Sequence, residues 1–311
     1  MKWTHKARIQ STIARLPFSE SLYYFVQRRF GTLHPRVMNP LIQIEGAIKI
    51  IQACRSVGRE IFGSRILEIG TGRRLEVPIV LWLMGASEIV TVDLNKYLKP
   101  TLVWEAIAYI RNNVSLIEQK LQTVQDVPGF HERLSKLIAS VPSDWNALLE
   151  TVSVRYLAPA DARCLPFPAR SFDYHVSLNV LEHIPTESLK RILIEAKRLL
   201  KPGGTIVHAV DPSDHFSHQD ESITEVNFLQ FDEAQWSRLA GNQHMYHNRL
   251  RSVELLELFA EAGFTIIWSG EAIDPRSLRV LQSGFPVDRR FKRFSPEELA
   301  VTKVDIVANA D

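Results

Sequence analysis

The sequence predicts an α/β fold with a mostly parallel, doubly wound sheet. The first observation is an apolar run that ends in two glycines, segment 65–73, followed by an apolar run that ends in an acid, segment 89–93. Together they are typical of a strand, a glycine-rich turn, a helix and a second strand. The second observation is that two further apolar runs, 171–179 and 205–210, are separated by a helical pattern, as expected where parallel strands alternate with helices.

The turn after the first strand predicts a ligand that contains a nucleoside. Gly70 and Gly72 carry no Cβ, so the backbone there can approach a ligand closely. Asp93 ends the second strand, where its carboxylate can accept hydrogen bonds from the two hydroxyls of a ribose. A nucleoside-containing cofactor is therefore expected at this edge of the sheet.

A dinucleotide fits the same residues less well. Its usual motif has a third glycine three positions after the second, whereas residues 73–75, which follow Gly72, include none. Glu68, just before the first glycine, would also repel a pyrophosphate. A carboxylate at that position instead suits a ligand with a cationic amino group.

At these residues the chain resembles the class I S-adenosylmethionine-dependent methyltransferases. The resemblance rests on four motifs that occur in the family's order, namely Glu68-Ile-Gly-Thr-Gly72, Asp161-Ala162, Val180-Leu-Glu-His-Ile-Pro185 and Leu199-Leu-Lys-Pro-Gly-Gly204. It covers residues 60–270 apart from one insert. It implies a seven-stranded, Rossmann-like sheet with an antiparallel last strand, and S-adenosylmethionine as the cofactor.

The resemblance also implies which residues bind that cofactor. The first motif would hold the methionine portion, Asp93 the ribose, and Asp161 with Ala162 the adenine, while Asn179 would lie beneath the sulfonium. The complete set of implied cofactor-binding residues is Glu68, Gly70, Thr71, Gly72, Asp93, Leu94, Asp161, Ala162 and Asn179.

Two histidines are candidates for the base that a hydroxyl acceptor requires. His183 follows the fourth strand. The loop after the fifth strand begins at Asp211, and in it His215 lies beside Asp214. Histidine titrates near neutral pH, and a neighbouring carboxylate can hold its tautomer. We therefore predict His215, His183, Asp214 and Asp211 as catalytic residues. The alternative for His183 is that it shapes the pocket without taking part in the chemistry.

Three further side chains are predicted to contact the acceptor. Arg249 and Arg251 precede a predicted helix and can pair with a phosphate or a uronate. His218 lies in the same loop as His215 and is a candidate substrate contact.

No metal site is expected from the sequence. In some hydroxyl-methylating relatives an acid occupies the position of Asn179, and a neutral amide is a weaker ligand. The loop residues Asp211, Asp214, His215, His218 and Asp220 could instead supply oxygen and imidazole ligands. Such clusters in polar loops more often bind substrate or remain solvated.

A narrower resemblance concerns the acceptor. Asp214-His-Phe216, Asn248-Arg-Leu-Arg251 and Leu16-Pro-Phe18 are similar to segments of bacterial methyltransferases found with surface-glycan and polysaccharide assembly systems. This resemblance implies O-methylation of a sugar hydroxyl on a glycan intermediate. The alternatives are a small natural product or quinone precursor as the acceptor, or a scaffold that binds the cofactor without turnover.

The predicted organisation is a helical N-terminal arm, residues 1–60, and a methyltransferase domain, residues 61–311. Residues 1–36 carry seven Lys and Arg residues and one acid, interleaved with aromatic residues. Such a segment can rest on an anionic bilayer or grip a phosphorylated lipid carrier. The alternative is an arm packed on the domain with its charges solvated.

The domain contains a helical insert between its second and third strands, residues 96–155. Because one crossover helix is enough to join parallel strands, the remainder is predicted to be a substrate lid, or alternatively a stabilising helical appendage.

Composition narrows the remaining classes. A net charge of +2 argues against a general nucleic-acid-binding protein. Cys54 and Cys164 give neither a disulfide framework nor a metal motif, which is typical of a reducing compartment. With no secretory or membrane-spanning pattern, the sequence predicts a cytoplasmic protein, with the arm as a peripheral contact to the inner membrane.

Overall fold

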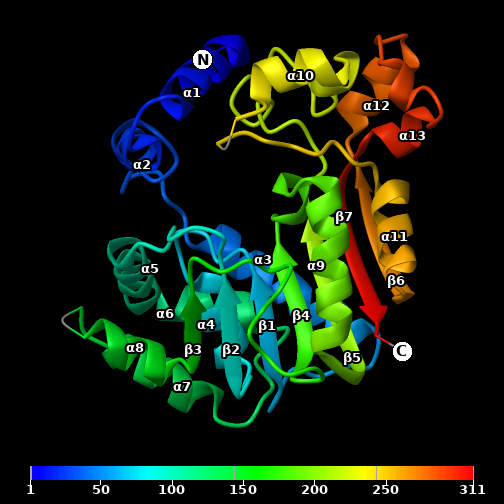
Figure 1. The fold of residues 1–311 in the computed structure, drawn as a ribbon. Coiled ribbons are helices and arrows are strands. Elements are labelled where there is room, and N and C mark those ends of the chain that lie inside the picture. The colour runs from blue at the N-terminus through cyan, green and yellow to red at the C-terminus, as the bar shows by residue number, and fades with distance from the viewer. Residues whose placement is uncertain (1, 143, 243, 311) are drawn as a thin grey trace.

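A seven-stranded sheet with the order β3-β2-β1-β4-β5-β7-β6 forms the centre of the computed structural model, which describes residues 2–142, 144–242 and 244–310 (Figure 1). The strands are β1 (Arg65–Ile69), β2 (Glu88–Val92), β3 (Val154–Leu157), β4 (Phe172–Leu178), β5 (Leu200–Val210), β6 (Thr265–Ile273) and β7 (Val301–Asn309). Strands β1 to β5 pair in parallel, and β7 runs antiparallel to both of its neighbours. The predicted fold class is confirmed.

The strand order reverses between β1 and β4, and this switch point positions the site. In open parallel sheets a ligand binds outside the carboxyl ends of the strands where the order reverses. Here the Gly70 N–H donates to the carbonyl of Val92 at 2.8 Å, so the glycine turn lies beside the end of β2. The Asn179 N–H donates to the carbonyl of Ala209 at 2.8 Å, which joins the ends of β4 and β5.

Alternating residues of the central strands build two apolar cores, one on each face of the sheet. Ile66 of β1 packs in one cluster, whereas its neighbour Leu67 packs in the other, as the two-residue period of a strand requires. The first cluster is covered by α3 (Leu41–Ser56) and α4 (Glu76–Leu83). The second is covered by α9 (Thr186–Leu199) and α11 (Ser252–Glu261).

The insert between β2 and β3 is helical, as predicted. Its helices are α5 (Pro100–Asn112), α6 (Val114–Leu121), α7 (Phe130–Ala139) and α8 (Trp145–Thr151). Buried residues of all four, such as Ile107 and Leu134, belong to the core cluster that also contains α3 and α4. The insert therefore lies against the flank of the sheet, and a role as substrate lid stays a prediction.

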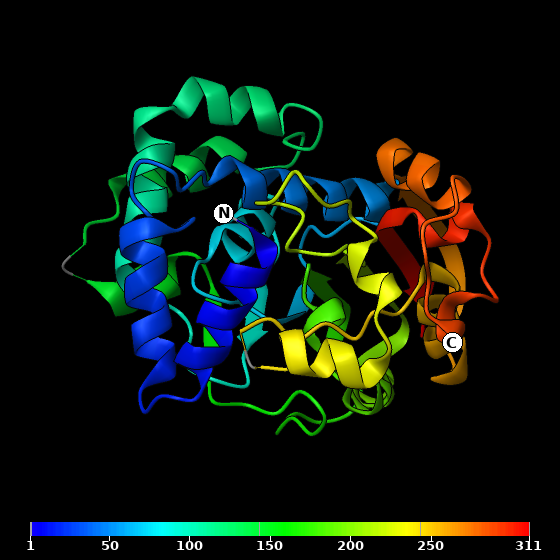
Figure 2. The same cartoon turned by 90° about the horizontal axis from the view of Figure 1, so that it is seen from above.

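The first two helices cross above the carboxyl edge of the sheet (Figures 1 and 2). They are α1 (Trp3–Ala14) and α2 (Ser19–Phe30), hereafter the arm. The ring of Trp3 lies 5.6 Å from that of Phe216, and its backbone N–H donates to Asp220 at 2.6 Å. The predicted arm extended to residue 60, but α3 packs in the central core, so only α1 and α2 lie outside it.

The remaining helices sit over the β5–β7 side of the sheet. They are α10 (Glu233–Ala240), α12 (Pro275–Gln282), α13 (Pro296–Leu299) and the short turns η1 (Leu181–His183), η2 (Asn227–Gln230) and η3 (Arg289–Phe291). A third apolar cluster joins α10, α12 and α13 to Ala7 of the arm. Phe216, from the loop after β5, belongs to the same cluster. The loop therefore packs against both the arm and the helices α10, α12 and α13.

Two histidines are buried in the sheet itself. Nδ1 of His175 in β4 lies 3.1 Å from Nε2 of His208 in β5, and the Ser177 hydroxyl bonds to Nδ1 of His208 at 2.6 Å. Burial lowers the pKa of His175 to about 3 and that of His208 well below its ordinary value. Both rings are therefore neutral in the folded protein.

This pair predicts a loss of stability in acid. In the unfolded chain a histidine takes up a proton near pH 6.5, but folded His175 does not, so the free energy of unfolding falls as pH drops below 6.5. Well below pH 6.5, each such histidine contributes about 1.4 kcal/mol per pH unit to the slope. In urea unfolding between pH 7 and pH 5.5, where an unfolded histidine is only partly protonated, His175→Asn is expected to show a mean slope smaller by about 0.6 proton. The exposed His131→Asn is the control, and equal slopes in parent and His175→Asn would contradict the account.

Candidate cofactor and acceptor site

The glycine turn after β1 adopts the left-handed backbone conformation that favours glycine. Gly70 has φ +83° and Gly72 has φ +67°. A Cβ on Gly70 would lie 2.5 Å from Cγ2 of Val180, so glycine is required for the turn to pack against the end of β4. A Cβ on Gly72 would meet no atom of the described residues within 4 Å, so this part of the turn borders open space.

Asp93 lies at the end of β2, facing the turn. Its Oδ2 accepts hydrogen bonds from the Gly72 N–H at 3.0 Å and from the Tyr156 hydroxyl at 3.4 Å. Burial raises the pKa of this carboxyl to about 7 despite these hydrogen bonds. Hydroxyl donors from a ribose would favour its ionised form, so Asp93 fits the predicted role in cofactor binding.

Glu68 is buried in β1, beneath the turn. The Thr91 hydroxyl donates to its carboxylate, and the Thr71 hydroxyl contacts Thr91 in turn. Burial raises the pKa of Glu68 to about 8. The link from Glu68 to the turn thus passes through Thr91 and Thr71, and a direct contact with the amino group of methionine stays a prediction.

The predicted adenine contacts lie in the loops after β2 and β3. The Ala160 N–H donates to the Asp93 carbonyl at 2.8 Å and holds these loops together. Leu94 is 65% exposed and offers an apolar surface beside Asp93. Ala162 packs against the core, whereas Asp161 pairs with Arg163 at 2.6 Å, which lowers the pKa of Asp161. Adenine recognition by Asp161 and Ala162 remains a prediction, since Arg163 already engages the carboxylate.

Asn179 follows β4 in the left-handed conformation, with φ 53°. Asparagine tolerates this conformation better than most side chains. Its position between β4 and Val180 places it next to the glycine turn, and its location beneath the sulfonium stays a prediction.

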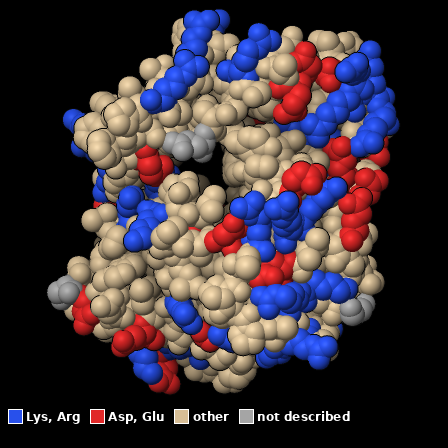
Figure 3. All heavy atoms as spheres, in the orientation of Figure 1, with Lys and Arg blue, Asp and Glu red and all other residues tan. Residues whose placement is uncertain are grey.

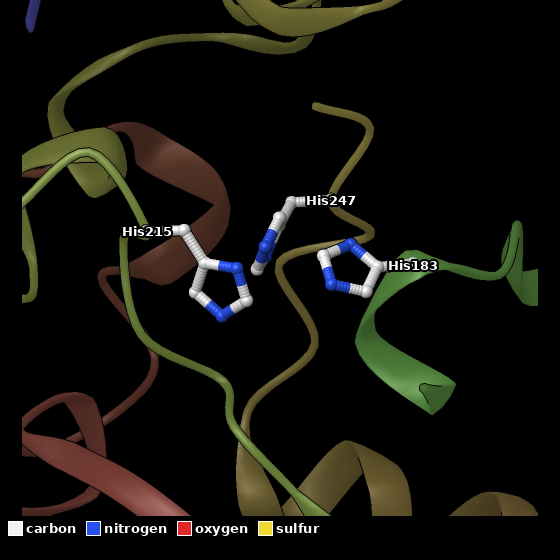
Figure 4. A group of neighbouring side chains, drawn as sticks. All are labelled: His183, His215 and His247. Carbon is white, nitrogen blue, oxygen red and sulfur yellow. The ribbon is translucent and has the colours of Figure 1, made fainter. Parts of the chain in front are cut away.

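Three histidines from distant segments converge at the same edge of the sheet (Figure 4). His183 comes from η1, His215 from the loop after β5, and His247 from the segment before α11. The ring centroids lie 5.0 Å apart for His183 and His215, 4.7 Å for His183 and His247, and 4.1 Å for His215 and His247. We refer to these three residues as the histidine cluster. His247 was not predicted, because the neighbouring motif Asn248–Arg251 assigns it no role and only the fold brings it to the other two.

Asp211, and not Asp214, is the acid beside His215. Oδ2 of Asp211 lies 3.5 Å from Nε2 of His215, and the Ser213 N–H donates to Oδ1 of Asp211 at 3.0 Å. Burial acts to raise the pKa of Asp211, but contacts with His215 and Ser213 outweigh it and bring the pKa to about 2.

The pairing of Asp214 with His215 that was predicted from their adjacency is therefore wrong. Asp214 is buried and accepts hydrogen bonds from the Phe216 N–H at 2.9 Å and from the Asn227 amide at 3.2 Å. Consecutive side chains in this loop point in different directions, and Asp214 serves to shape the loop.

His218 lies beside Asp211, on the more exposed side of the loop after β5. Its Nε2 is 3.5 Å from Glu225 and 3.8 Å from Asp211, and contact with Glu225 raises the pKa of His218. The side chain is partly exposed, and its role as a substrate contact stays a prediction.

Arg249 and Arg251 do not form the predicted anion-binding site. Both are 1% exposed. Arg249 donates to the carbonyls of Phe228 and Phe231 and pairs with Glu233 at 2.7 Å. Arg251 donates to the Pro212 carbonyl at 2.6 Å. These guanidinium groups hold the loops around the site, and the sequence could not distinguish this structural use from a contact with substrate.

Comparison with known proteins identifies a family for most of the chain. The sequence matches the methyltransferase-domain family over residues 41–268. Among curated proteins, none matches it.

Several solved structures are similar to this chain at low sequence identity. A protein from Pyrococcus horikoshii has 14% sequence identity and a TM-score of 0.49, covering 91% of this chain and 97% of that one. An S-adenosylmethionine-dependent methyltransferase from Mesorhizobium loti has 16% identity and a TM-score of 0.43, covering 86% and 99%. One from Methanosarcina mazei has 19% identity and a TM-score of 0.41, covering 79% and 92%.

The geometry of Asp93 predicts the effect of removing its charge. Asp93→Asn is expected to weaken S-adenosylmethionine binding roughly 10- to 100-fold, since a hydrogen bond to a charged group contributes about 1.5–3 kcal/mol. Isothermal titration calorimetry measures this change, with the exposed Asp126→Asn as the matched control. Unchanged binding by Asp93→Asn would place the ribose elsewhere.

Proposed function

Since residues 41–268 match the methyltransferase-domain family, the chain belongs to that family, and we propose that it methylates a hydroxyl group of a sugar or glycan intermediate. S-adenosylmethionine is the cofactor. The proposal rests on the position of His215 and Asp211 in the loop after β5, at the carboxyl edge of the sheet. The end of β5 is joined to the end of β4 by the hydrogen bond from the Asn179 N–H to the Ala209 carbonyl. A base and an orienting carboxylate thus lie near the predicted position of the methyl donor.

The reaction needs alignment and the removal of one proton. When bound, S-adenosylmethionine supplies a methyl group on a cationic sulfur. The acceptor oxygen forms a bond to the methyl carbon as the sulfur–carbon bond breaks, and the hydroxyl proton passes to an imidazole nitrogen. His215 is placed for this step because Asp211, at 3.5 Å, can stabilise the imidazolium that forms.

His183 is the second candidate for the base. Its Nδ1 lies 2.9 Å from the Tyr246 carbonyl, an acceptor, so this nitrogen carries the proton and donates. The lone pair is then on Nε2, which faces the histidine cluster (Figure 4). This arrangement supports either proton transfer or binding of the acceptor hydroxyl.

The choice of a glycan acceptor rests on the resemblance of Asp214–Phe216 and Asn248–Arg251 to the corresponding segments of methyltransferases of surface-glycan assembly. The structure adds one restriction. Because the guanidinium groups of Arg249 and Arg251 are buried and occupied by carbonyls, they supply no subsite for a phosphate or a uronate. A neutral sugar hydroxyl fits this environment better than an anionic acceptor.

Removal of the base tests the catalytic assignment. His215→Ala is expected to lower kcat roughly 100- to 10,000-fold while leaving S-adenosylmethionine affinity unchanged, and Asp211→Asn is expected to lower kcat less. Transfer of a labelled methyl group to a panel of sugar, nucleotide-sugar and lipid-linked acceptors measures the rate. If the double variant His183→Ala, His215→Ala binds the donor normally and keeps full turnover, the assignment is wrong.

We further propose that the arm contacts an anionic membrane surface. Phe18, Phe25 and Phe30 are exposed at 85%, 60% and 78%, and the guanidinium group of Arg29 lies 5.7 Å from the centre of the Phe30 ring. Figure 3 shows basic side chains on the upper part of the molecule, where α1 lies, above a hollow that separates the arm from the sheet. In the part of the chain that the structure describes, no helix is long and apolar enough to cross a membrane, so the contact proposed here is peripheral.

Vesicle sedimentation tests this contact. The variant with Phe18, Phe25 and Phe30 replaced by Ser is expected to lose binding to vesicles that contain an anionic lipid, because the aromatic side chains can no longer insert. A matched control replaces the exposed Val141, Ile194 and Ile273, which lie elsewhere on the surface. Equal sedimentation of the parent and the aromatic variant would exclude membrane contact through these residues.

A further inference from the structure

We propose that the histidine cluster of His183, His215 and His247 binds a divalent transition-metal ion of the Zn²⁺ class. Metal binding itself does not depend on the acceptor, whereas the catalytic role given to the ion below rests on the proposed function. The inference replaces the expectation from the sequence that no metal is bound, and it uses imidazole ligands that the sequence did not bring together.

The distances are close to those of a coordination sphere. Each ring offers one nitrogen, and these ligand atoms all lie within 4.8 Å of one another. Zn²⁺ binds imidazole nitrogens at about 2.0–2.1 Å, so neighbouring ligands of a tetrahedral ion are about 3.3 Å apart. Side-chain rotations that move each nitrogen by about 1 Å would therefore form three ligand positions and leave a fourth open.

His247 carries the strongest evidence for a ligand. It is 3% exposed, and neither of its ring nitrogens has a hydrogen-bond partner among the described residues. An unsatisfied buried polar group costs about 1–3 kcal/mol. Its ring points into the space between His183 and His215, where a bound ion would supply the missing partner (Figure 4).

The other two rings are held as metal-binding histidines usually are. A ligating histidine commonly gives its second nitrogen to a backbone carbonyl or a carboxylate. Nδ1 of His183 bonds to the Tyr246 carbonyl at 2.9 Å, and Nε2 of His215 faces Asp211 at 3.5 Å. The remaining nitrogen of each ring is turned toward the cluster (Figure 4). The tautomer of His183 is thus set so that the lone pair of its Nε2 is free for the proposed ion, while Nε2 of His215 has Asp211 nearby but makes no hydrogen bond among the described residues.

Glu182 places a second buried carboxyl group beside the cluster. Its carboxylate is 1% exposed, and neither oxygen has a hydrogen-bond partner within the described ranges. Oε1 lies 3.9 Å from Nε2 of His183. Burial raises the pKa of Glu182 well above its ordinary value, so the carboxyl group is neutral without a cation, and a bound cation would favour its charged form. The negative charge near the cluster is that of Asp211, 3.5 Å from His215.

The ligand types select the class of ion. Imidazole nitrogen suits Zn²⁺, Cu²⁺, Fe²⁺ and Ni²⁺, whereas Mg²⁺ and Ca²⁺ prefer oxygen ligands. His218 also lies near His215 and Asp211, but it is more exposed and already contacts Ser213 and Glu225. We therefore place the ion among His183, His215 and His247, with His218 outside.

An ion at this position changes how the acceptor is activated. A metal-bound hydroxyl loses its proton far more readily than a free one. His215 cannot bind the ion and accept that proton with the same lone pair, so in the loaded protein the ion activates the hydroxyl and the proton leaves to solvent. Loaded and metal-free protein are accordingly expected to differ in the pH dependence of kcat.

The experiment is a titration of chelator-treated, full-length protein with Co²⁺, followed by visible absorption. One equivalent is expected to bind with the intense bands of a near-tetrahedral site, and Zn²⁺ is expected to displace it. His247→Ala is expected to weaken binding at least roughly 100-fold, since altering an outer-shell partner alone costs 10- to 100-fold. The control is His131→Ala, which removes an imidazole that is 78% exposed.

Folding of each variant is checked by its affinity for S-adenosylmethionine, which the cluster does not contact in the proposed site. If His247→Ala does not fold, His183→Ala takes its place in the same titration. Absence of a stoichiometric Co²⁺ complex, or equal Co²⁺ affinity in a folded variant, would overturn the proposed metal site. Methyl transfer without metal binding would leave the proposed function intact, whereas Co²⁺ binding without methyl transfer to any acceptor would support the metal site and contradict that function.

Discussion

The close contact between Gly70 and Val180 is the constraint on which the site depends. With a Cβ at Gly70 the two turns would clash at 2.5 Å, so only glycine lets the turn after β1 lie against the end of β4. Val180 leads directly into η1, which carries His183, and Asn179 is tied to the end of β5 by its hydrogen bond to Ala209. One contact thus places the cofactor turn, the predicted sulfonium site and the histidine cluster at the same edge of the sheet.

Features encoded over short stretches of chain were predictable from the sequence. The glycine turn and Asp93 follow from a local pattern of strand, turn and strand, and the parallel sheet follows from the alternation of apolar runs with helices. The helical insert was also predictable, because its apolar residues recur at helical spacing. The packing of the insert beside α3 and α4 was not predictable, because helical periodicity shows that one face of a helix is buried but does not identify the element that covers that face.

Features that depend on side-chain direction or on distant segments were not predictable. Asp214 directly precedes His215 in the chain, yet the loop turns so that Asp211, and not Asp214, contacts the His215 ring. The charge of Arg249 suggested a ligand contact, but its guanidinium satisfies carbonyls inside the protein. His247 completes the cluster only through tertiary structure. In each case the deciding quantity is burial or orientation, which residue type alone does not specify.

In the proposed site, the methyl donor binds at the switch point with its sulfur toward the histidine cluster. The most direct measurement is anomalous diffraction from crystals of the full-length protein grown with S-adenosylhomocysteine and Co²⁺. We expect sulfur density between the glycine turn and Asn179, and a cobalt peak among His183, His215 and His247. Ligand density away from the carboxyl ends of β1 and β4, or a cluster that faces away from the sulfur, would contradict it.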